Sequence, residues 1–289
     1  MPLESILAFQ LFNGIVWGLI FALIALGLSL TFGLMNLMNI AHAAFYMLGA
    51  VITATLIQWG LGFWEAVLIA TLTVGLIGVV VNQLVLVHVA DAPPVIGLLA
   101  TAGLLLLIDS LTLASFGSVP VAVDAPFDAA IPLLGLEYPT YRLLVAGIAV
   151  LLIVATFLFL RWTPLGLWMR AVPGHRELAV IAGIAPNRIN LATVVLGSLL
   201  AGMAGGLVTP IAGAHFQMGD AVLAPAFTVI VVGGAGNLWG AVTVAIGLGI
   251  LRGVVSAFVA PTLAEILSLL ILLPLLLLRP NGLFGNKHG

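Results

Sequence analysis

The sequence predicts an all-α membrane protein, a polytopic helical bundle of about eight or nine transmembrane helices with a cytoplasmic coupling helix. Of its 289 residues, 63% are hydrophobic and only 6% are charged. A soluble domain is about one quarter charged. Apolar runs of about 20 residues, the length that crosses the hydrocarbon core, recur along the whole chain. We therefore treat residues 1–289 as a single transmembrane domain.

Each predicted span is an apolar segment bounded by polar residues, glycine or proline. The segment near 222–236 is short and ends in G-G-A-G-N, so a broken or re-entrant helix is the alternative there, and both eight and nine crossings are open. The predicted spans lie near 10–33, 42–58, 63–87, 94–114, 142–160, 190–210, 222–236, 238–258 and 262–279.

The few basic residues predict the orientation. Four of the eight fall in one polar stretch of about residues 161–190, and Arg279 and Lys287 follow the last span. Because Lys and Arg accumulate in cytoplasmic loops, we place this stretch and the C-terminal tail inside. The loop from Ser115 to Tyr141 carries acidic residues and no base, which suits the outer face. Counting spans back from there places the N-terminus outside.

Four pairs of glycines are spaced four residues apart, which lets helix backbones approach closely in lipid. We expect all four to serve packing within one subunit. The pairs are Gly14/Gly18, Gly202/Gly206, Gly236/Gly240 and Gly249/Gly253.

Polar residues interrupt the first half of the chain where lipid would favour none. Asn36, Asn39 and His42 join the first two spans, and their spacing of three places them near one face if the segment is helical. They either bond to neighbouring helices or line a wet pathway. No further ligands lie nearby for a metal at His42.

Two charges fall inside predicted spans. Asp109 is either a functional carboxylate or an interfacial residue, neutral or paired with Ser110 and Thr112. Arg252 either extends to the interface or pairs with a carboxylate such as Glu265.

The polar stretch contains a predicted short amphipathic helix from Glu177 to Ile184, with Leu178, Ile181 and Ala182 on one side. Gly183 and Pro186 end it. We expect it to present apolar side chains to a partner, the alternative being a connector that rests on the headgroups.

The chain lacks a phosphate-binding loop for ATP. Its only lysine is Lys287, so the glycine-rich run at 233–240 has no lysine to reach a phosphate. Any ATP-Mg that the function requires must be bound by another subunit. We expect no enzyme activity and no cofactor in this chain.

Four blocks of this sequence resemble the permeases of the branched-chain amino acid ABC importer family. They occur in the family's order and are specific in combination. The blocks are N-I-A-H-A-A-F-Y-M-L-G-A from Asn39, L-W-M-R-A-V-P-G-H-R-E-L-A-V-I-A-G-I-A-P-N-R from Leu167, V-V-G-G-A-G-N-L-W-G-A from Val231 and R-P-N-G-L-F-G from Arg279.

The resemblance implies a multi-pass subunit of the bacterial inner membrane, with four kinds of partner: membrane lipid, a similar second permease, two cytoplasmic ATPases and an extracytoplasmic solute-binding protein. A nucleic acid is not expected. The resemblance implies a pathway-lining motif at Asn39, Ala41, His42 and Phe45. With the polar residues noted above, the candidate substrate pathway comprises Asn36, Asn39, His42, Phe45, Tyr46 and Asp109. The implied ATPase-coupling residues are Arg170, Arg176, Glu177, Leu178, Ala179, Ile181, Gly183 and Arg188.

The chain departs from the family's pattern in the pathway. Ala43 and Ala44 stand where the family commonly has Gly-Glu, and Asp109 stands where a neutral amide is common. Relatives also move urea and short amides, so the expected cargo is an amino acid of the branched-chain type or a related small polar solute.

Two rival functions remain open from the residues. An ion-coupled secondary transporter or channel would use Asp109 and Arg252 as coupling charges. A membrane-embedded enzyme would use His42 and His215, but no nucleophile–base spacing supports it.

Overall fold

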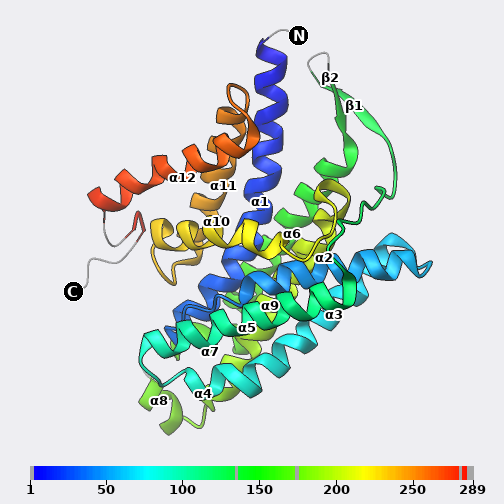
Figure 1. Cartoon of the computed structure of the whole chain (residues 1–289). Coiled ribbons are helices and arrows are strands. Elements are labelled where there is room, and N and C mark those ends of the chain that lie inside the picture. Colours follow the sequence, from blue (N-terminus) through cyan, green and yellow to red (C-terminus); the bar gives the residue numbers. More distant parts are fainter. Residues whose placement is uncertain (1–2, 134–135, 173–175, 280–281, 285–289) are drawn as a thin grey trace.

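Helix α1 (Leu3–Met35) runs through the centre of a helical bundle in the computed structural model (Figure 1). The structure describes residues 3–133, 136–172, 176–279 and 282–284, and only the backbone of residues 133, 136, 176, 177, 272, 273 and 275–277. Every residue of α1 from Gly18 to Thr31 is buried. A helix that is apolar around its whole circumference is stable only when other helices surround it, as they do here.

All nine segments that the sequence predicts as spans are helical. Among the described residues, six helices are long and apolar enough to cross a membrane, and the apolar helices 42–58, 218–233 and 261–271 are shorter. The helices in the nine predicted segments are α1, α2 (His42–Gln58), α3 (Phe63–Val81) continued by the π-helical η1 (Asn82–Leu86) and by α4 (Val87–Val89), α5 (Pro94–Phe116), α6 (Thr140–Trp162), α9 (Pro186–Ala212), α10 (Met218–Gly233), α11 (Leu238–Ser256) and α12 (Pro261–Leu278).

The predicted glycine pairs pack within the chain. A Cβ at Gly14 would lie 2.5 Å from the Gly249 carbonyl oxygen, and one at Gly18 would lie 2.9 Å from the Ile246 Cα. Gly253 meets the backbone of Gln10 and Gly14 in the same way. Two glycine pairs, one on α1 and one on α11, therefore form a single backbone contact.

The other two pairs also contact helices of the same chain. Gly202 on α9 packs against Gly49 on α2, and Gly206 faces Thr53. Gly236 meets Gly33 at the end of α1. Intrasubunit packing, as expected from the sequence, is thus confirmed at each pair.

The loop between α5 and α6 contains a hairpin that no pattern in the sequence predicts. Strands β1 (Ala130–Leu133) and β2 (Leu136–Pro139) pair antiparallel, with Ala130 opposite Pro139. Strands of four residues are too short for a recognisable alternation. Tyr138 of β2 contacts the rings of Phe9 and Phe12 with centroid distances of 5.2 and 5.8 Å, which anchors the hairpin to α1.

Two short helices, α7 (Pro164–Ala171) and α8 (Arg176–Ile181), lie at the end of the bundle opposite the hairpin (Figure 1). No periodic pattern in the sequence predicts α7, which has eight residues. Its start is nevertheless encoded locally, because Thr163 accepts a hydrogen bond from the Gly166 N–H at 3.0 Å and Pro164 takes the first helical position.

Candidate functional site

The chain between α1 and α2 leaves the helical conformation inside the bundle. Residues 36–41 are not helical, and Asn36 has a positive φ of 50°. The buried Thr101 of α5 holds the break: its hydroxyl accepts from the Ile40 N–H at 3.2 Å and lies 3.1 Å from the Met38 carbonyl oxygen. The expectation of one shared helical face for Asn36, Asn39 and His42 therefore does not apply.

The break buries two of the predicted pathway residues. Asn39 is 0% and His42 is 2% exposed, whereas Asn36 is exposed. The His42 ring lies against α1, so that a Cβ at Gly27 would come within 2.8 Å of Nε2. The imidazole also interacts with the backbone of Ile24 on the same helix.

Several buried polar atoms around the break have no partner within the described part of the chain. They are Asn39 Nδ2 and Oδ1, His42 Nε2 and Ser29 Oγ. Unpaired buried polar atoms are costly and few in native proteins, so each requires an explanation. Irregular backbone at membrane depth occurs where protein buries it or where it lines a cavity, and broken helices form the binding sites of many transporters.

Phe45 and Tyr46 follow on α2 and are buried at 0% and 2% exposure. The Phe45 ring meets the His42 ring edge-on at 5.7 Å. The Tyr46 carbonyl faces Gly205 of α9. These two side chains thus belong to the packed contact between α2 and its neighbours, directly beside the break.

Asp109 lies apart from the break, on α5, and is half-buried. Its Oδ1 has no hydrogen-bond partner among the described residues. The alternative that Asp109 pairs with Ser110 and Thr112 is wrong, because these hydroxyls donate to the Leu106 and Ile108 carbonyls of their own helix at 2.7 and 2.8 Å. The charge that acts on Asp109 is that of Asp220 at the start of α10.

The predicted coupling segment is organised around α8. Leu178, Val180 and Ile181 are 59%, 58% and 82% exposed, whereas Ala179 is buried in a cluster with Val172 and Ile189. The helix ends at Ile181 rather than at Ile184, because Gly183 adopts φ +80° and the Ile184 N–H donates to the Ala179 carbonyl. The three residues expected on the apolar side, Leu178, Ile181 and Ala182, are all exposed, although Ala182 follows the helix rather than belonging to it. Val180 is a further exposed apolar residue.

The remaining coupling residues occupy three positions. Arg170 lies in the last turn of α7 and, with Arg161, lines a groove of about 1100 Å³ whose wall includes the stacked rings of Phe157 and Trp239, 4.1 Å apart. Arg188 lies exposed in the first turn of α9. The side chains of Arg176 and Glu177 lie outside the described residues.

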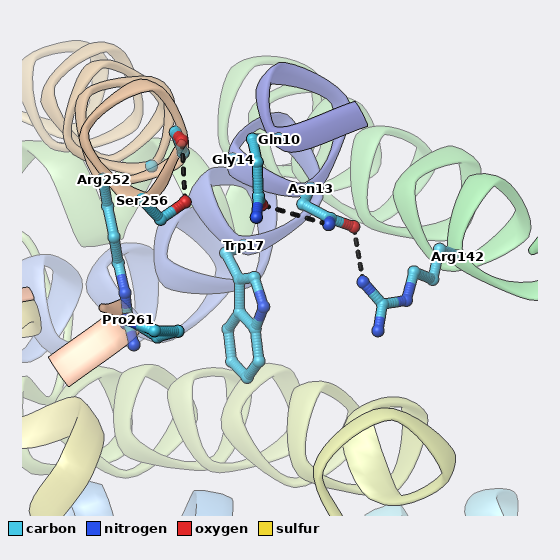
Figure 2. A pocket seen from close by; sticks show the side chains of 10 residues that line it. Gln10, Asn13, Gly14, Trp17, Arg142, Arg252, Ser256 and Pro261 are labelled. Atoms are coloured by element: carbon cyan, nitrogen blue, oxygen red, sulfur yellow. Dashed lines mark hydrogen bonds between the residues drawn. The ribbon is translucent and has the colours of Figure 1, made fainter. Parts of the chain in front are cut away.

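Arg252 takes part in an ion pair and lines a cavity at the end of the bundle near the hairpin. Arg252 pairs with Glu265, Nη2 to Oε2 at 2.9 Å, which confirms one of the two alternatives. It lines a second cavity with Gln10, Asn13 and Arg142 (Figure 2). The available signals were two amides in the first apolar span and Arg142, the first basic residue of the chain.

Comparisons with known proteins give one consistent result. The family model for the branched-chain amino acid transport system / permease component matches residues 10–276. The high-affinity branched-chain amino acid transport system permease protein LivH of Escherichia coli (strain K12) is 27% identical over 304 residues, which is 96% of each chain. BraD of Pseudomonas aeruginosa has the same identity and coverage. LivM of Escherichia coli (strain K12) is 27% identical over 92% of this chain and 68% of its own.

Among solved structures, PsaBC from Streptococcus pneumoniae in complex with Fab is similar, with a TM-score of 0.51 at 13% identity over 94% of this chain and 92% of that chain. This likeness concerns the fold, which agrees with the predicted helical membrane bundle. The family match and the full-length relatives together show that the chain belongs to the family of branched-chain amino acid transport system permease components, which are multi-pass transport proteins of the inner membrane.

Proposed function

We propose that this chain is the permease subunit of an ATP-driven importer for a branched-chain amino acid or a related small polar solute such as urea or an amide. It works with a second permease, two cytoplasmic ATPases that bind ATP-Mg, and an extracytoplasmic solute-binding protein. The similarity to both LivH and LivM of one organism supports a pair of related permeases.

The observation that carries the ATP-driven part of the proposal is the exposed apolar surface of α8. Leu178, Val180 and Ile181 project from a six-residue helix at the arginine-rich end of the bundle, while Ala179 ties the helix to Met169 and Ile189. Apolar side chains on a short, anchored helix suit docking into a groove of a soluble partner. Movement of that partner then acts on α9, which begins five residues after α8 ends.

The pathway in this proposal runs past the break between α1 and α2. The unpaired polar atoms of Asn39 and His42 offer hydrogen bonds to a small polar solute once the helices reorient. Such contacts are few, so they hold the solute weakly and allow its release. We place selectivity mainly in the solute-binding protein.

Transport by the co-expressed complex in proteoliposomes tests the coupling surface. Leu178→Asp and Ile181→Asp should abolish ATP-dependent uptake and stimulated ATP hydrolysis, because each places a charge in an apolar contact. Ile131→Asp, at a residue of β1 that is 43% exposed, is the matched control and should retain both. Uptake by the chain alone down an ion gradient, with no co-purifying ATPase, would overturn the proposal.

A further inference from the structure

The outer half of the bundle contains a polar cavity of about 130 Å³ that the proposed pathway does not use. Figure 2 shows it between α1, which contributes Gln10, Asn13 and Trp17, and the two arginines that reach it from α6 and α11. The glycine contact between α1 and α11 brings these side chains together, because Gly14, Gly249 and Gly253 also line the cavity.

The cavity carries one excess positive charge. Arg252 is neutralised by Glu265, with their atoms 2.9 Å apart. Arg142 instead donates to a neutral acceptor, Asn13 Oδ1, and among the described residues no carboxylate lies within ion-pair distance of it. A guanidinium has five donors in a planar fork that matches the oxygens of a carboxylate or phosphate. The contacts of Arg142 in the structure, with Asn13 Oδ1 and the Tyr138 hydroxyl, are with neutral groups, so its charge has no counterion among the described residues.

The supporting side chains hold Arg142 in position. Asn13 Oδ1 also accepts from the Tyr138 hydroxyl at 3.1 Å, and Asn13 Nδ2 lies 3.4 Å from Gln10 Oε1. Burial raises the pKa of the Tyr138 phenol, so it remains a donor at neutral pH. Opposite, the Arg252 guanidinium lies 5.8 Å from the centroid of the Trp17 ring. The cationic groups are thus ordered before any ligand arrives.

The two arginines of the cavity lie close to the ends of their helices. Arg142 is the third residue of α6 and Arg252 lies four residues before the end of α11, on the end predicted to face outward. Helix α1, at about 50 Å for 33 residues, exceeds the hydrocarbon core of about 30 Å, so its first turns extend into the interface. Trp17 and Tyr138 are the aromatic types that gather there.

We propose that this cavity binds a singly charged oxyanion, the phosphate group of an outer-leaflet phospholipid, held by Arg142 with help from Arg252 and Gln10. One phosphodiester balances the excess charge, and its headgroup oxygens reach the donors from the interface while the acyl chains stay in lipid. Free inorganic phosphate shares the chemistry and is the other source to be distinguished.

The test measures the thermal unfolding midpoint of the purified full-length chain in detergent, with any subunits that co-purify. The probes are a short-chain phosphatidylglycerol, inorganic phosphate, and a galactolipid that has no phosphate. We expect phosphatidylglycerol to raise the midpoint and the galactolipid to leave it unchanged. Arg142→Gln should weaken the apparent affinity for phosphatidylglycerol roughly tenfold, the effect of losing one charge-assisted contact.

Asn13→Asp is the sharper variant. It preserves the acceptor for Arg142 and Tyr138 but supplies an internal carboxylate, so the folded complex should no longer respond to phosphatidylglycerol. Arg279→Gln removes a cation outside the cavity and should respond as the wild type does. Unchanged responses in both cavity variants, or an equal loss in Arg279→Gln, would overturn the site. Equal protection by inorganic phosphate supports the oxyanion site and assigns its ligand to the aqueous phase. None of these readouts requires transport, so the result is independent of the proposed function.

Discussion

Single side chains decide the chemistry of the helix break. Thr101 satisfies the Ile40 N–H and contacts the Met38 carbonyl, so one hydroxyl on α5 supports a non-helical segment 61 residues earlier in the chain. Most other buried threonines here bond only to carbonyls of their own helix, as Thr112 does to Ile108. Thr101 differs from Thr112 because its hydroxyl also contacts the backbone of another segment, at Ile40 and Met38.

Thr101→Val should therefore destabilise the protein and reduce uptake. The change is nearly isosteric and leaves the Ile40 N–H without its partner, which costs about 1–3 kcal/mol. Thr112→Val, on the same helix and buried to a similar degree, should be close to neutral. Thermal unfolding and uptake by the reconstituted complex provide the two readouts; equal effects of the two changes would contradict this role of Thr101.

Substitution of Asp109 distinguishes the proposed importer from an ion-coupled transporter. Its unpartnered Oδ1, with Asp220 as the neighbouring charge, is the feature that favours ion coupling. Under the proposed function, Asp109→Asn retains ATP-dependent uptake, because the carboxylate is not part of the coupling surface. Uptake measured with and without an imposed proton or sodium gradient checks this. Loss of uptake in the variant, together with gradient dependence in the wild type, would favour the rival mechanism.

The pairing of α1 with α11 shows how helices of this chain associate. In lipid there is no hydrophobic gain from bringing two apolar helices together, so close backbone approach and van der Waals contact decide which faces meet. Gly14, Gly18, Gly249 and Gly253 allow that approach. The same contact defines one wall of the outer cavity.

Two glycines on α11 allow a matched comparison. A Cβ at Gly249 would overlap the Gly14 carbonyl oxygen and the Gly18 backbone, whereas one at Gly247 would meet nothing within 4 Å. Gly249→Ala should destabilise the protein by about 1–3 kcal/mol through overpacking. Gly247→Ala should be neutral or stabilise by up to about 1 kcal/mol, because alanine favours the helix. The unfolding midpoints of both variants in one detergent measure the difference.

The whole molecule has two unlike ends. The hairpin and the outer cavity lie at one end, and α7 and α8 with their arginines lie at the other (Figure 1). The distribution of Lys and Arg predicts that the second end faces the cytoplasm. The proposed division of labour, solute entry at one end and ATPase docking at the other, depends on this orientation.

Cysteine labelling measures the orientation directly, because the natural chain contains no cysteine. Ile131→Cys should react with a membrane-impermeant maleimide in spheroplasts. Ile181→Cys, which replaces a side chain that is 82% exposed, should react only after the membrane is permeabilised. The reverse pattern would invert the topology and place the apolar surface of α8 outside.

The helical segments were predictable from the sequence more completely than the functional residues and their contacts. Apolar length is a local property, so all nine segments were recognisable, whereas β1, β2 and α7 are too short to produce a periodic signal. The spacing of the glycine pairs was visible in the sequence, but the sequence did not show which pairs would contact each other. Asp109 and His42 stood out as polar residues in apolar surroundings, although their roles remain predictions. Of the alternatives for Asp109, the pairing with Ser110 and Thr112 was wrong, because hydroxyls in apolar helices bond to their own backbone.

The amino-acid sequence by itself determined the membrane class, the helical segments, the family motifs and the basic end of the chain. Each of these depends on composition or on neighbours within about 20 residues. Only the tertiary structure decided that the break between α1 and α2 buries Asn39 and that Arg252 pairs with Glu265. It also decided that Arg142 meets Asn13 across 129 positions of sequence. Such pairs form because folding brings distant helix faces into contact, and no local pattern records which faces will meet.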